Sequence, residues 1–398
     1  PTRIRTEMFV FESGNVAAAT GVKLARAQVI AAYPITPQTP LTEKLSGYVD
    51  SGELEAEYVA VESEHSALAV CIGATSTGAR AFTATSANGL LYMSEQVHWT
   101  AGARLPMVMC VVNRGVGAPW SVWNDHQDSI SQRDAGWIQI YAKDHQEIID
   151  TVIKAYRLSE EVCIPVMVCY DGYYLSHTYM PYEVPDQEQV DAFLPPYEYR
   201  HTLGPENPTS LNTVTLPGGR TDIDGNRVPG YMEIRRSLHM ELREAIAVHT
   251  RIDSEFKAMF GRGGNALAER YLCDDAEYVA VALGSMSNQI KDAVDLLSDD
   301  YILSISTKDV HQFALHTLAQ AHVKLGQMDQ AISTLQRARA LGPMTVTVIG
   351  ATWFWQRNMN YLRELLEAAG EQRKAREVSE ELDEKLILAD AGHPFRSF

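Results

Sequence analysis

Residues 14–180 alternate between short apolar runs and segments with helical spacing of apolar positions. Apolar runs bounded by turn residues predict strands, whereas apolar residues recurring every three to four positions predict helices. Strands are expected at residues 28–34, 56–64, 80–86, 105–114 and 164–172. Helices are expected at residues 15–27, 39–52, 65–78, 89–102 and 145–162. Nearly continuous apolar strands separated by helices indicate an α/β fold, in which helices cover both faces of a parallel sheet.

The expected strands end on polar side chains. Thr36, Glu64, Ser86, Arg114 and Asp171 stand at or just beyond the carboxyl ends of five strands. In parallel sheets of this kind, ligands bind beyond those ends. This convergence predicts a functional site at the carboxyl edge of the sheet.

The first strand runs into the stretch YPITP, residues 33–37. Its two prolines restrict the backbone and favour a rigid turn. Such a turn suits the presentation of the Thr36 hydroxyl to a ligand. A threonine before a helix also commonly bonds to its own turn, so Thr36 by itself leaves both interpretations open.

The other candidates have ordinary structural explanations when each is taken alone. Glu64 lies where an acidic side chain suits the dipole of a helix start. The stretch TSANGLLYMSE, residues 85–95, contains a helix-capping signal that is equally suited to a phosphate or an aromatic ring. Arg114 ends an apolar strand, where a solvated cation is the common case. Only their combination points to chemistry.

Metal and redox chemistry are weakly supported by the residues themselves. Asp125, His126 and Asp128 suggest metal ligands, but no further ligands keep regular spacing, so no metal site is expected on this chain. The cysteines form no CxxC pair and no ferredoxin-like spacing, and we expect reduced, mostly buried thiols. They are Cys71, Cys110, Cys163, Cys169 and Cys273.

Four segments are expected along the chain. The α/β domain occupies residues 1–182, and an extended arm rich in proline and glycine occupies residues 183–235. A connecting helix from residue 236 and a strand near 276–283 begin a second, smaller α/β domain within residues 236–297. Residues 298–398 are expected to form a helical tail.

The tail carries one copy of a tetratricopeptide-like pattern and one looser copy. The first copy consists of Leu318, Ala319, Ala331, Leu335, Ala338 and Pro343. The looser copy consists of Gly370, Ala375, Ser379 and Leu382. One good and one poor copy predict two packed helix pairs and not a long repeat array.

Composition excludes several classes of partner. The formal net charge is −17, from 34 basic and 51 acidic residues, which argues against nucleic acid or an anionic membrane as the main partner. No apolar run approaches the roughly 20 residues of a membrane-spanning helix. The first residues show no signal-peptide pattern, so a cytoplasmic protein is expected.

Five motifs, taken together and in order, resemble a known family. They are YPITP (33–37), ESEH (62–65), TSANGLLYMSE (85–95), the long stretch NRGVGAPWSVWNDHQDSISQRDAGWIQIY (113–141), and DGYYLSHT (171–178) followed by FLPPY (193–197). The chain resembles the α-subunit, or domain I, of 2-oxoacid:ferredoxin oxidoreductases of the pyruvate:ferredoxin type. The resemblance covers roughly residues 10–300, and the tail departs from it.

The resemblance implies a thiamine-type pyrimidine-binding domain and a thiamine-diphosphate-dependent enzyme. Glu64 would hydrogen-bond the aminopyrimidine ring as a catalytic residue. Arg114 and Thr36 would bind the carboxylate and the oxo group of the substrate. The remaining residues of the cofactor wall would be Tyr33, Pro34, Ile35, Ser86 and Asn88. The implied reaction converts a 2-oxoacid and coenzyme A to acyl-CoA and CO2, with ferredoxin as the electron acceptor.

One half of the cofactor site is missing from the sequence. Thiamine enzymes hold the diphosphate through Mg²⁺ on a G-D-G motif followed by an asparagine, and the DGN at 224–226 has the wrong order. The resemblance therefore implies a β-type partner subunit that binds the diphosphate and Mg²⁺. It also implies a ferredoxin-like subunit, with 4Fe–4S clusters on the partners, and a chain that is inactive alone.

The sequence leaves alternatives open for the substrate and for the enzymatic role itself. Pyruvate is expected, with branched-chain 2-oxoacids, oxalate and 2-oxoglutarate as competitors. The stretch NRGVGAPW, residues 113–120, favours the pyruvate or branched-chain type, and Trp120 and Trp123 either narrow the pocket or pack under the loop. The alternative without catalysis is a scaffold subunit whose tail recruits partners.

Overall fold

The computed structural model describes residues 8–198, 218–221, 224–225, 227–265, 267–274, 276, 279–298, 308–341 and 351–386. The chain divides into two compact units, Pro1–Met286 and Ser287–Phe398. Within the described ranges, every helix is too short or too polar to cross a lipid bilayer.

A parallel sheet forms the centre of the first unit. Its strands are β2 (Val29–Ala32), β3 (Glu57–Ala60), β4 (Ala81–Thr85), β5 (Val108–Asn113), β6 (Ile138–Tyr141) and β7 (Val166–Asp171). Their order across the sheet is β3-β2-β4-β5-β7-β6, and each neighbouring pair is parallel. The expected α/β fold with a parallel sheet is confirmed.

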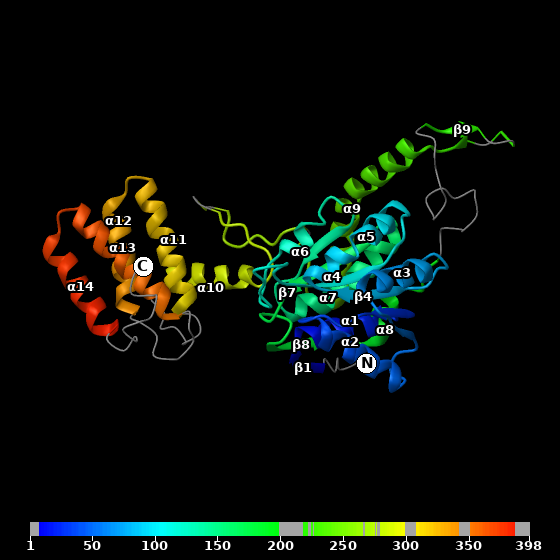
Figure 1. Cartoon of the computed structure of the whole chain (residues 1–398), viewed down its shortest axis with the longest axis horizontal. Helices are drawn as coiled ribbons and strands as arrows, with labels where there is room; N and C mark the ends of the chain where they lie inside the picture. The colour runs from blue at the N-terminus through cyan, green and yellow to red at the C-terminus, as the bar shows by residue number, and fades with distance from the viewer. Residues whose placement is uncertain are drawn as a thin grey trace. The chain divides into compact units, whose positions relative to one another are not determined.

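Helices bury both faces of this sheet. One apolar core combines strand residues with α1 (Gly14–Leu24), α2 (Thr39–Asp50) and α7 (His145–Val162). A second core lies against α3 (Glu64–Thr75), α4 (Ala87–Tyr92) and α5 (Ser94–Gly102). Figure 1 shows α1 and α2 away from α3, α4 and α5, with the sheet between the two groups.

Strand β5 shows why the strands read as unbroken apolar runs. Val108, Cys110 and Val112 belong to the first core, whereas Met109 and Val111 belong to the second. Successive side chains of a strand point to opposite faces, so both faces must be apolar when both are covered. Each fully buried side chain of this size contributes about 1.5–3 kcal/mol to folding.

Side-chain caps fix where two of these helices begin. Ser63 precedes α3 and accepts a hydrogen bond from the Ser66 backbone N–H at 3.2 Å. Asp144 precedes α7 and accepts from the Glu147 backbone N–H at 2.8 Å. These bonds satisfy donors that the first helical turn leaves unpaired. The α3 cap holds the first turn of this helix, which carries the predicted site residue Glu64.

The proline-rich segment after the sheet has more structure than the sequence predicts. Strand β8 (Tyr179–Val184) pairs antiparallel with β1 (Met8–Ser13), and α8 (Gln187–Phe193) follows. Helix α8 is only seven residues long, and it is anchored because its Val190 and Phe193 are buried in the first core. Residues 199–217 of the expected arm lie outside the described residues.

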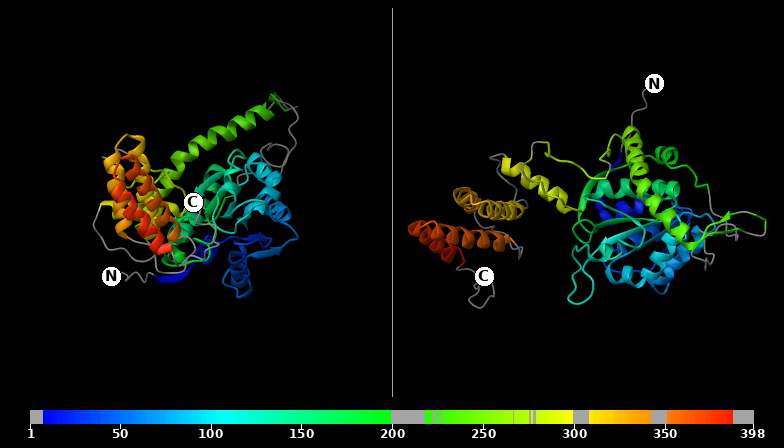
Figure 2. Two further views of the ribbon diagram at one scale, coloured as in Figure 1. Left: turned by 60° about the vertical axis from the view of Figure 1, so that its left-hand side comes forward. Right: turned by 90° about the horizontal axis from the view of Figure 1, so that it is seen from above.

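The long helix α9 (Tyr231–Phe260) begins five residues before the expected start at 236. Gly230 and Glu233 form its capping box, in which Glu233 Oε2 accepts from the Gly230 N–H at 3.2 Å. A small hairpin of β9 (Arg220–Thr221) and β10 (Arg227–Val228) precedes it. Figure 2 shows this end of α9 extending away from the sheet.

The strand expected near 276–283 is not formed in its described part. Residues 279–283 belong to no strand, and the side chains of Val279 and Val281 are largely exposed. An extended segment needs a neighbouring strand for its backbone groups, and no described strand pairs with it. The expected turn at Gly284, with φ of +65°, and the helix after it, α10 (Met286–Ser298), are present.

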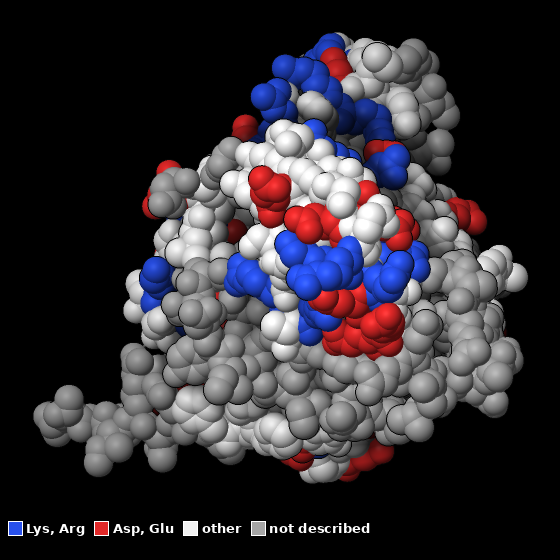
Figure 3. Space-filling view, turned by 90° about the vertical axis from the view of Figure 1, so that its left-hand side faces the viewer, with Lys and Arg blue, Asp and Glu red and all other residues white. Residues whose placement is uncertain are grey.

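The described residues of the second unit are helical. Helices α11 (Lys308–Lys324) and α12 (Met328–Leu341) form one hairpin, and α13 (Ala351–Ala368) and α14 (Gln372–Leu386) form another. Their shared core contains Ala319, Ala331, Leu335, Ala338 and Leu382 of the predicted pattern. Pro343 lies outside the described residues. Figure 3 shows one face on which basic and acidic side chains lie close together.

Candidate active site

The predicted site residues meet at the carboxyl edge of the sheet. Their strands stand in the order β3, β2, β4, β5 and β7, which places Glu64, Thr36, Ser86, Arg114 and Asp171 along one edge. The chain passes from β2 to β3 on one side and then to β4 on the other side of β2. This reversal makes the β2–β4 junction a topological switch point, where α/β sheets bind ligands.

The turn after β2 presents the Thr36 side chain to solvent. Thr36 is exposed and is joined to Pro37 by a cis peptide bond, whereas Pro37 and Gln38 are buried. The Pro37 carbonyl accepts a hydrogen bond from Asn15 Nδ2 at 2.9 Å. Gln38 Nε2 donates to the Ala84 carbonyl at 2.9 Å. Buried amides therefore fix the turn from below, and sequence reasoning missed both of them because neither belongs to a motif.

Glu64 is a buried carboxyl group at the first position of α3, with 8% of its surface exposed. It lies against Gly89 of α4, where an added Cβ atom would stand 2.7 Å from Glu64 Oε1 and 2.4 Å from Thr85 Oγ1. The Thr85 and Ser86 hydroxyls are buried, and neither has a partner among the described residues. A buried carboxyl beside unpaired hydroxyls suits a polar heterocycle, because a buried polar group left unpaired is costly.

Among the described residues, no carboxylate forms an ion pair with the Arg114 guanidinium. Its Cζ atom lies 5.1 Å from the ring centroid of Trp120, and its Nε is buried without a partner in the described chain. Burial lowers the pKa of Arg114, and the charge of Asp128 opposes that shift. A half-buried guanidinium with unused donors is ready to bind an anion such as a carboxylate.

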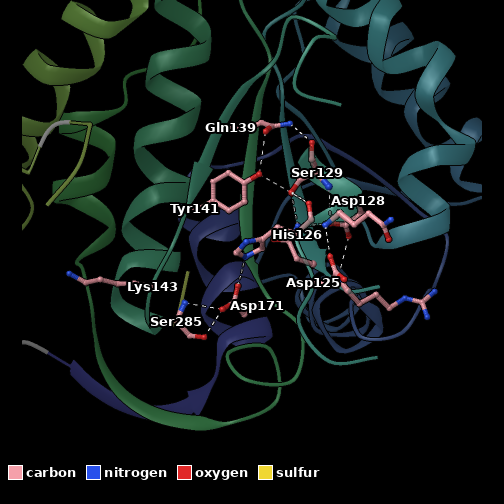
Figure 4. Close-up of polar contacts among 12 residues, drawn as sticks. Asp125, His126, Asp128, Ser129, Gln139, Tyr141, Lys143, Asp171 and Ser285 are labelled. Carbon is pink, nitrogen blue, oxygen red and sulfur yellow. Dashed lines mark hydrogen bonds and ion pairs between the residues drawn. The ribbon is translucent and has the colours of Figure 1, made fainter. Parts of the chain in front are cut away.

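The three residues considered as metal ligands point in different directions (Figure 4). Asp125 Oδ1 accepts from the Gln127 N–H, and His126 Nε2 bonds Asp171 Oδ1 at 2.9 Å. Asp128 faces the sheet edge instead. Across the described ranges, no three His, Cys, Asp or Glu side chains gather as metal ligands.

Asp128 is a buried group that the sequence did not single out for this role. Its oxygens accept hydrogen bonds from Ala87 N, Asn113 Nδ2, Arg114 N and Ser129 N. Burial raises the pKa of Asp128, and these donors oppose the shift. Asp128 lies in the short helix α6 (Gln127–Ile130). No local pattern reveals its contacts with Ala87, Asn113 and Arg114, since these residues come from other segments of the chain.

Asp171 joins the loop after β5 to the segment before α10. Besides His126, it accepts from the Ser285 backbone N–H at 2.8 Å and from the Ser285 hydroxyl. Gly284 makes this contact possible, because a Cβ atom there would stand 2.4 Å from Asp171 Oδ1. Asp171 is therefore fully engaged in holding two segments together.

Asn88 and Trp123 contact the loop and its neighbours. Asn88 Oδ1 accepts from the Gly117 backbone N–H at 3.1 Å, which holds the loop above α4. Trp123 packs against the rings of Tyr173 and Tyr174, with centroids 5.3 and 5.1 Å away. Trp120 and Trp123 are both more than half exposed, so neither is buried under the loop.

The fold and this edge define a class of protein: an α/β enzyme domain with a carboxyl, a hydroxyl and a guanidinium along the carboxyl edge of its sheet. The family model for pyruvate flavodoxin/ferredoxin oxidoreductase, thiamine diphosphate-binding, matches residues 20–240. The chain belongs to this family. The resemblance drawn from the five motifs is confirmed, as is assignment to the oxidoreductases.

Named relatives include subunits of two enzymes. The chain is 47% identical over 292 residues to pyruvate synthase subunit PorA of Methanocaldococcus jannaschii, covering 72% of each chain. It is 46% identical over 286 residues to ketoisovalerate oxidoreductase subunit VorA of Pyrococcus abyssi, covering 72% of this chain and 70% of that one.

A solved structure supports the fold alone. It is a 2-oxoglutarate:ferredoxin oxidoreductase from Magnetococcus marinus with 2-oxoglutarate, coenzyme A and succinyl-CoA bound. The similarity has a TM-score of 0.50 and 20% sequence identity, and it covers 73% of this chain. The chain spans about half, 51%, of that longer chain.

Proposed function

We propose that this chain is the α-subunit of a 2-oxoacid:ferredoxin oxidoreductase that converts pyruvate and coenzyme A to acetyl-CoA and CO2. The observation that carries the proposal is the Arg114 guanidinium, whose buried Nε has no partner among the described residues, at the same sheet edge as the buried Glu64 carboxyl. Family membership supports thiamine diphosphate as the cofactor. Electrons leave through iron–sulfur clusters on partner subunits to ferredoxin.

The residues around Glu64 fit the pyrimidine half of thiamine diphosphate. When bound, the cofactor would supply a carbon nucleophile towards 2-oxo groups and an electron sink for decarboxylation. The Glu64 carboxyl would hydrogen-bond the aminopyrimidine ring, and the Ser86 hydroxyl, which has no partner among the described residues, would be available to it. Tyr33, Pro34 and Ile35 form the wall of this half of the site, together with the exposed Asn88.

Arg114 and Thr36 bind the substrate from neighbouring segments. The guanidinium forms two parallel hydrogen bonds to the substrate carboxylate, and it stays protonated at neutral pH. The Thr36 hydroxyl donates to the 2-oxo oxygen. Because the turn that carries Thr36 is already fixed, substrate binding costs less conformational entropy.

The substrate class is a small 2-oxoacid. Pyruvate leads because the relatives include pyruvate synthase subunits at 44–47% identity. Branched-chain 2-oxoacids are the second candidate, favoured by 46% identity to ketoisovalerate oxidoreductase subunits. We propose that Trp120 and Trp123, both exposed on the loop that follows Arg114, select between these acids.

The rest of the cofactor site belongs to partners. A β-type subunit binds the diphosphate and Mg²⁺, because the sequence has no G-D-G motif with a following asparagine. A ferredoxin-like subunit carries clusters, since this chain's cysteines lack cluster spacing. The alternative is a scaffold subunit, which the paired hairpins of the second unit favour.

The test is an anoxic assay of the complex purified through this chain. We expect dye reduction that requires coenzyme A and one acid among pyruvate, 2-oxoisovalerate, 2-oxoglutarate and oxalate. Glu64→Gln should lower turnover by about two orders of magnitude or more while assembly survives. Arg114→Ala should mainly raise KM for the acid. A cofactor-loaded complex that oxidises none of these acids would support the scaffold alternative.

A further inference from the structure

Asp128 closes the loop that carries the proposed substrate cation. The loop begins at Arg114 and returns at Asp128, whose carboxylate is fully buried. Oδ2 accepts the Arg114 backbone N–H at 3.3 Å, and Oδ1 accepts the Ser129 backbone N–H at 2.7 Å. Oδ1 also accepts Asn113 Nδ2 at 2.7 Å, at the last residue of β5. One carboxylate thus joins both ends of the loop to the end of a sheet strand.

The same carboxylate reaches the helix beside the cofactor site. Its Oδ2 accepts the Ala87 backbone N–H, the first residue of α4, at 2.9 Å. Ala87 has a φ of +44°, in the left-handed region that residues with a side chain rarely adopt. Such a conformation persists only where surrounding contacts fix it, and this hydrogen bond is one of them.

Helix α4 contacts both the segment that carries the substrate-binding Arg114 and the Glu64 carboxyl of the cofactor site. The Ala87 backbone N–H bonds Asp128, and Asn88 Oδ1 accepts from the Gly117 backbone N–H near the start of the loop, 3.1 Å away. One residue further, Gly89 lies against the Glu64 carboxyl. The position of the substrate loop is therefore set from the helix that packs on the catalytic carboxyl.

The guanidinium itself receives little other support. Trp120 lies at 5.1 Å, and no carboxylate of the described chain pairs with it. The Arg114 backbone, which directly follows β5 and is held by Asp128, therefore sets where the side chain begins. A charge that binds substrate through two parallel bonds loses much of its effect when displaced by about 1 Å.

We propose that Asp128 is a positioning residue that holds the Arg114 loop against α4 and sets the 2-oxoacid site relative to Glu64. The proposal rests on the proposed function. It assigns Asp128 no contact with substrate or cofactor. Its role is to act through the backbone of Arg114.

The test compares Asp128→Asn with the unchanged complex. The amide keeps the shape but turns one acceptor into a donor facing backbone N–H groups. We expect KM for the 2-oxoacid to rise about ten- to a hundredfold, with thiamine diphosphate content unchanged. The effect should vanish in an Arg114→Ala background, because two residues acting through one contact are not additive.

Two further variants control for a general loss of stability and for failure of the Asp128→Asn complex to assemble. Asp253→Asn removes another buried carboxylate, paired with Lys154 at 2.8 Å, and should lower thermal stability without changing KM. Asp128→Glu keeps the charge while displacing the carboxylate, so it should raise KM even if Asp128→Asn fails to assemble. Wild-type KM in whichever Asp128 variant assembles, or equal KM effects with and without Arg114, would overturn the proposal. An unchanged complex inactive on every 2-oxoacid would instead overturn the proposed function.

Discussion

At the scale of single residues, the candidate site depends on Gly89, a residue without a side chain. Gly89 leaves room for the Glu64 carboxyl and the Thr85 hydroxyl on the same surface of α4. A methyl group there would approach both oxygens more closely than real Cβ atoms do. The requirement for glycine at this position is one of space.

Gly89→Ala is predicted to displace the Glu64 carboxyl. We expect turnover of the complex to fall about ten- to a hundredfold, with partial loss of bound thiamine diphosphate. The control is Gly73→Ala on α3, where an added Cβ meets nothing within 4 Å. That change should leave activity intact and stabilise the chain by about 0.5–1 kcal/mol. A Gly89→Ala complex with full cofactor content and turnover would contradict this role for Gly89.

At the scale of elements, one buried histidine stands between two helices of the second unit. His316 of α11 is 6% exposed, and its Nδ1 bonds Asn358 Oδ1 of α13 at 2.8 Å. Burial is the main cause that lowers the pKa of His316 from its ordinary 6.5. The folded helices therefore favour the neutral ring.

The helix pairs are predicted to lose stability in mild acid. A lowered folded-state pKa means that the unfolded chain binds the proton more readily, so stability is present above 6.5 and is lost as pH falls further. Hydrogen exchange of α11 and α13 should show less protection near about pH 5 than near about pH 8. His316→Gln should reduce this difference, and His322→Gln, at the end of the same helix, should not. An equal acid loss in His316→Gln would show that other groups cause it.

At the scale of the whole molecule, the chain consists of units with separate cores. The two cores around the sheet draw only on residues of the first unit, and the core of the helical hairpins draws only on residues 315–382. All proposed site residues belong to the first unit.

A chain shortened to end at Ser298 is predicted to retain the enzymatic activity of the complex. We expect it to assemble with its partners and to show the same KM and cofactor content as the full chain, because no site residue is removed. Trp355→Ala, which empties a buried position in the hairpins, should lower their stability and likewise spare KM. Failed assembly of the shortened chain would favour the scaffold role for the helical unit.

Much of the fold followed from local pattern. The apolar runs predicted the strands of the parallel sheet, except for β6 within the long motif. The strand expected near 276–283 is absent from the described residues 279–283, because alternation cannot reveal whether a partner strand exists. The early start of α9 and the short α8 were missed, because a capping box and two buried anchors decided them.

The sequence by itself determined the sheet, its covered faces and the edge where Thr36, Glu64 and Arg114 gather. It could do so because side-chain periodicity records which faces are buried, and parallel strands all end at one edge. Only the tertiary structure decided that Asp128 holds Ala87 and Arg114 together and that Gly89 lies on Glu64. Such contacts depend on which strands become neighbours and how closely the backbone approaches, and a linear pattern of polar and apolar residues contains neither.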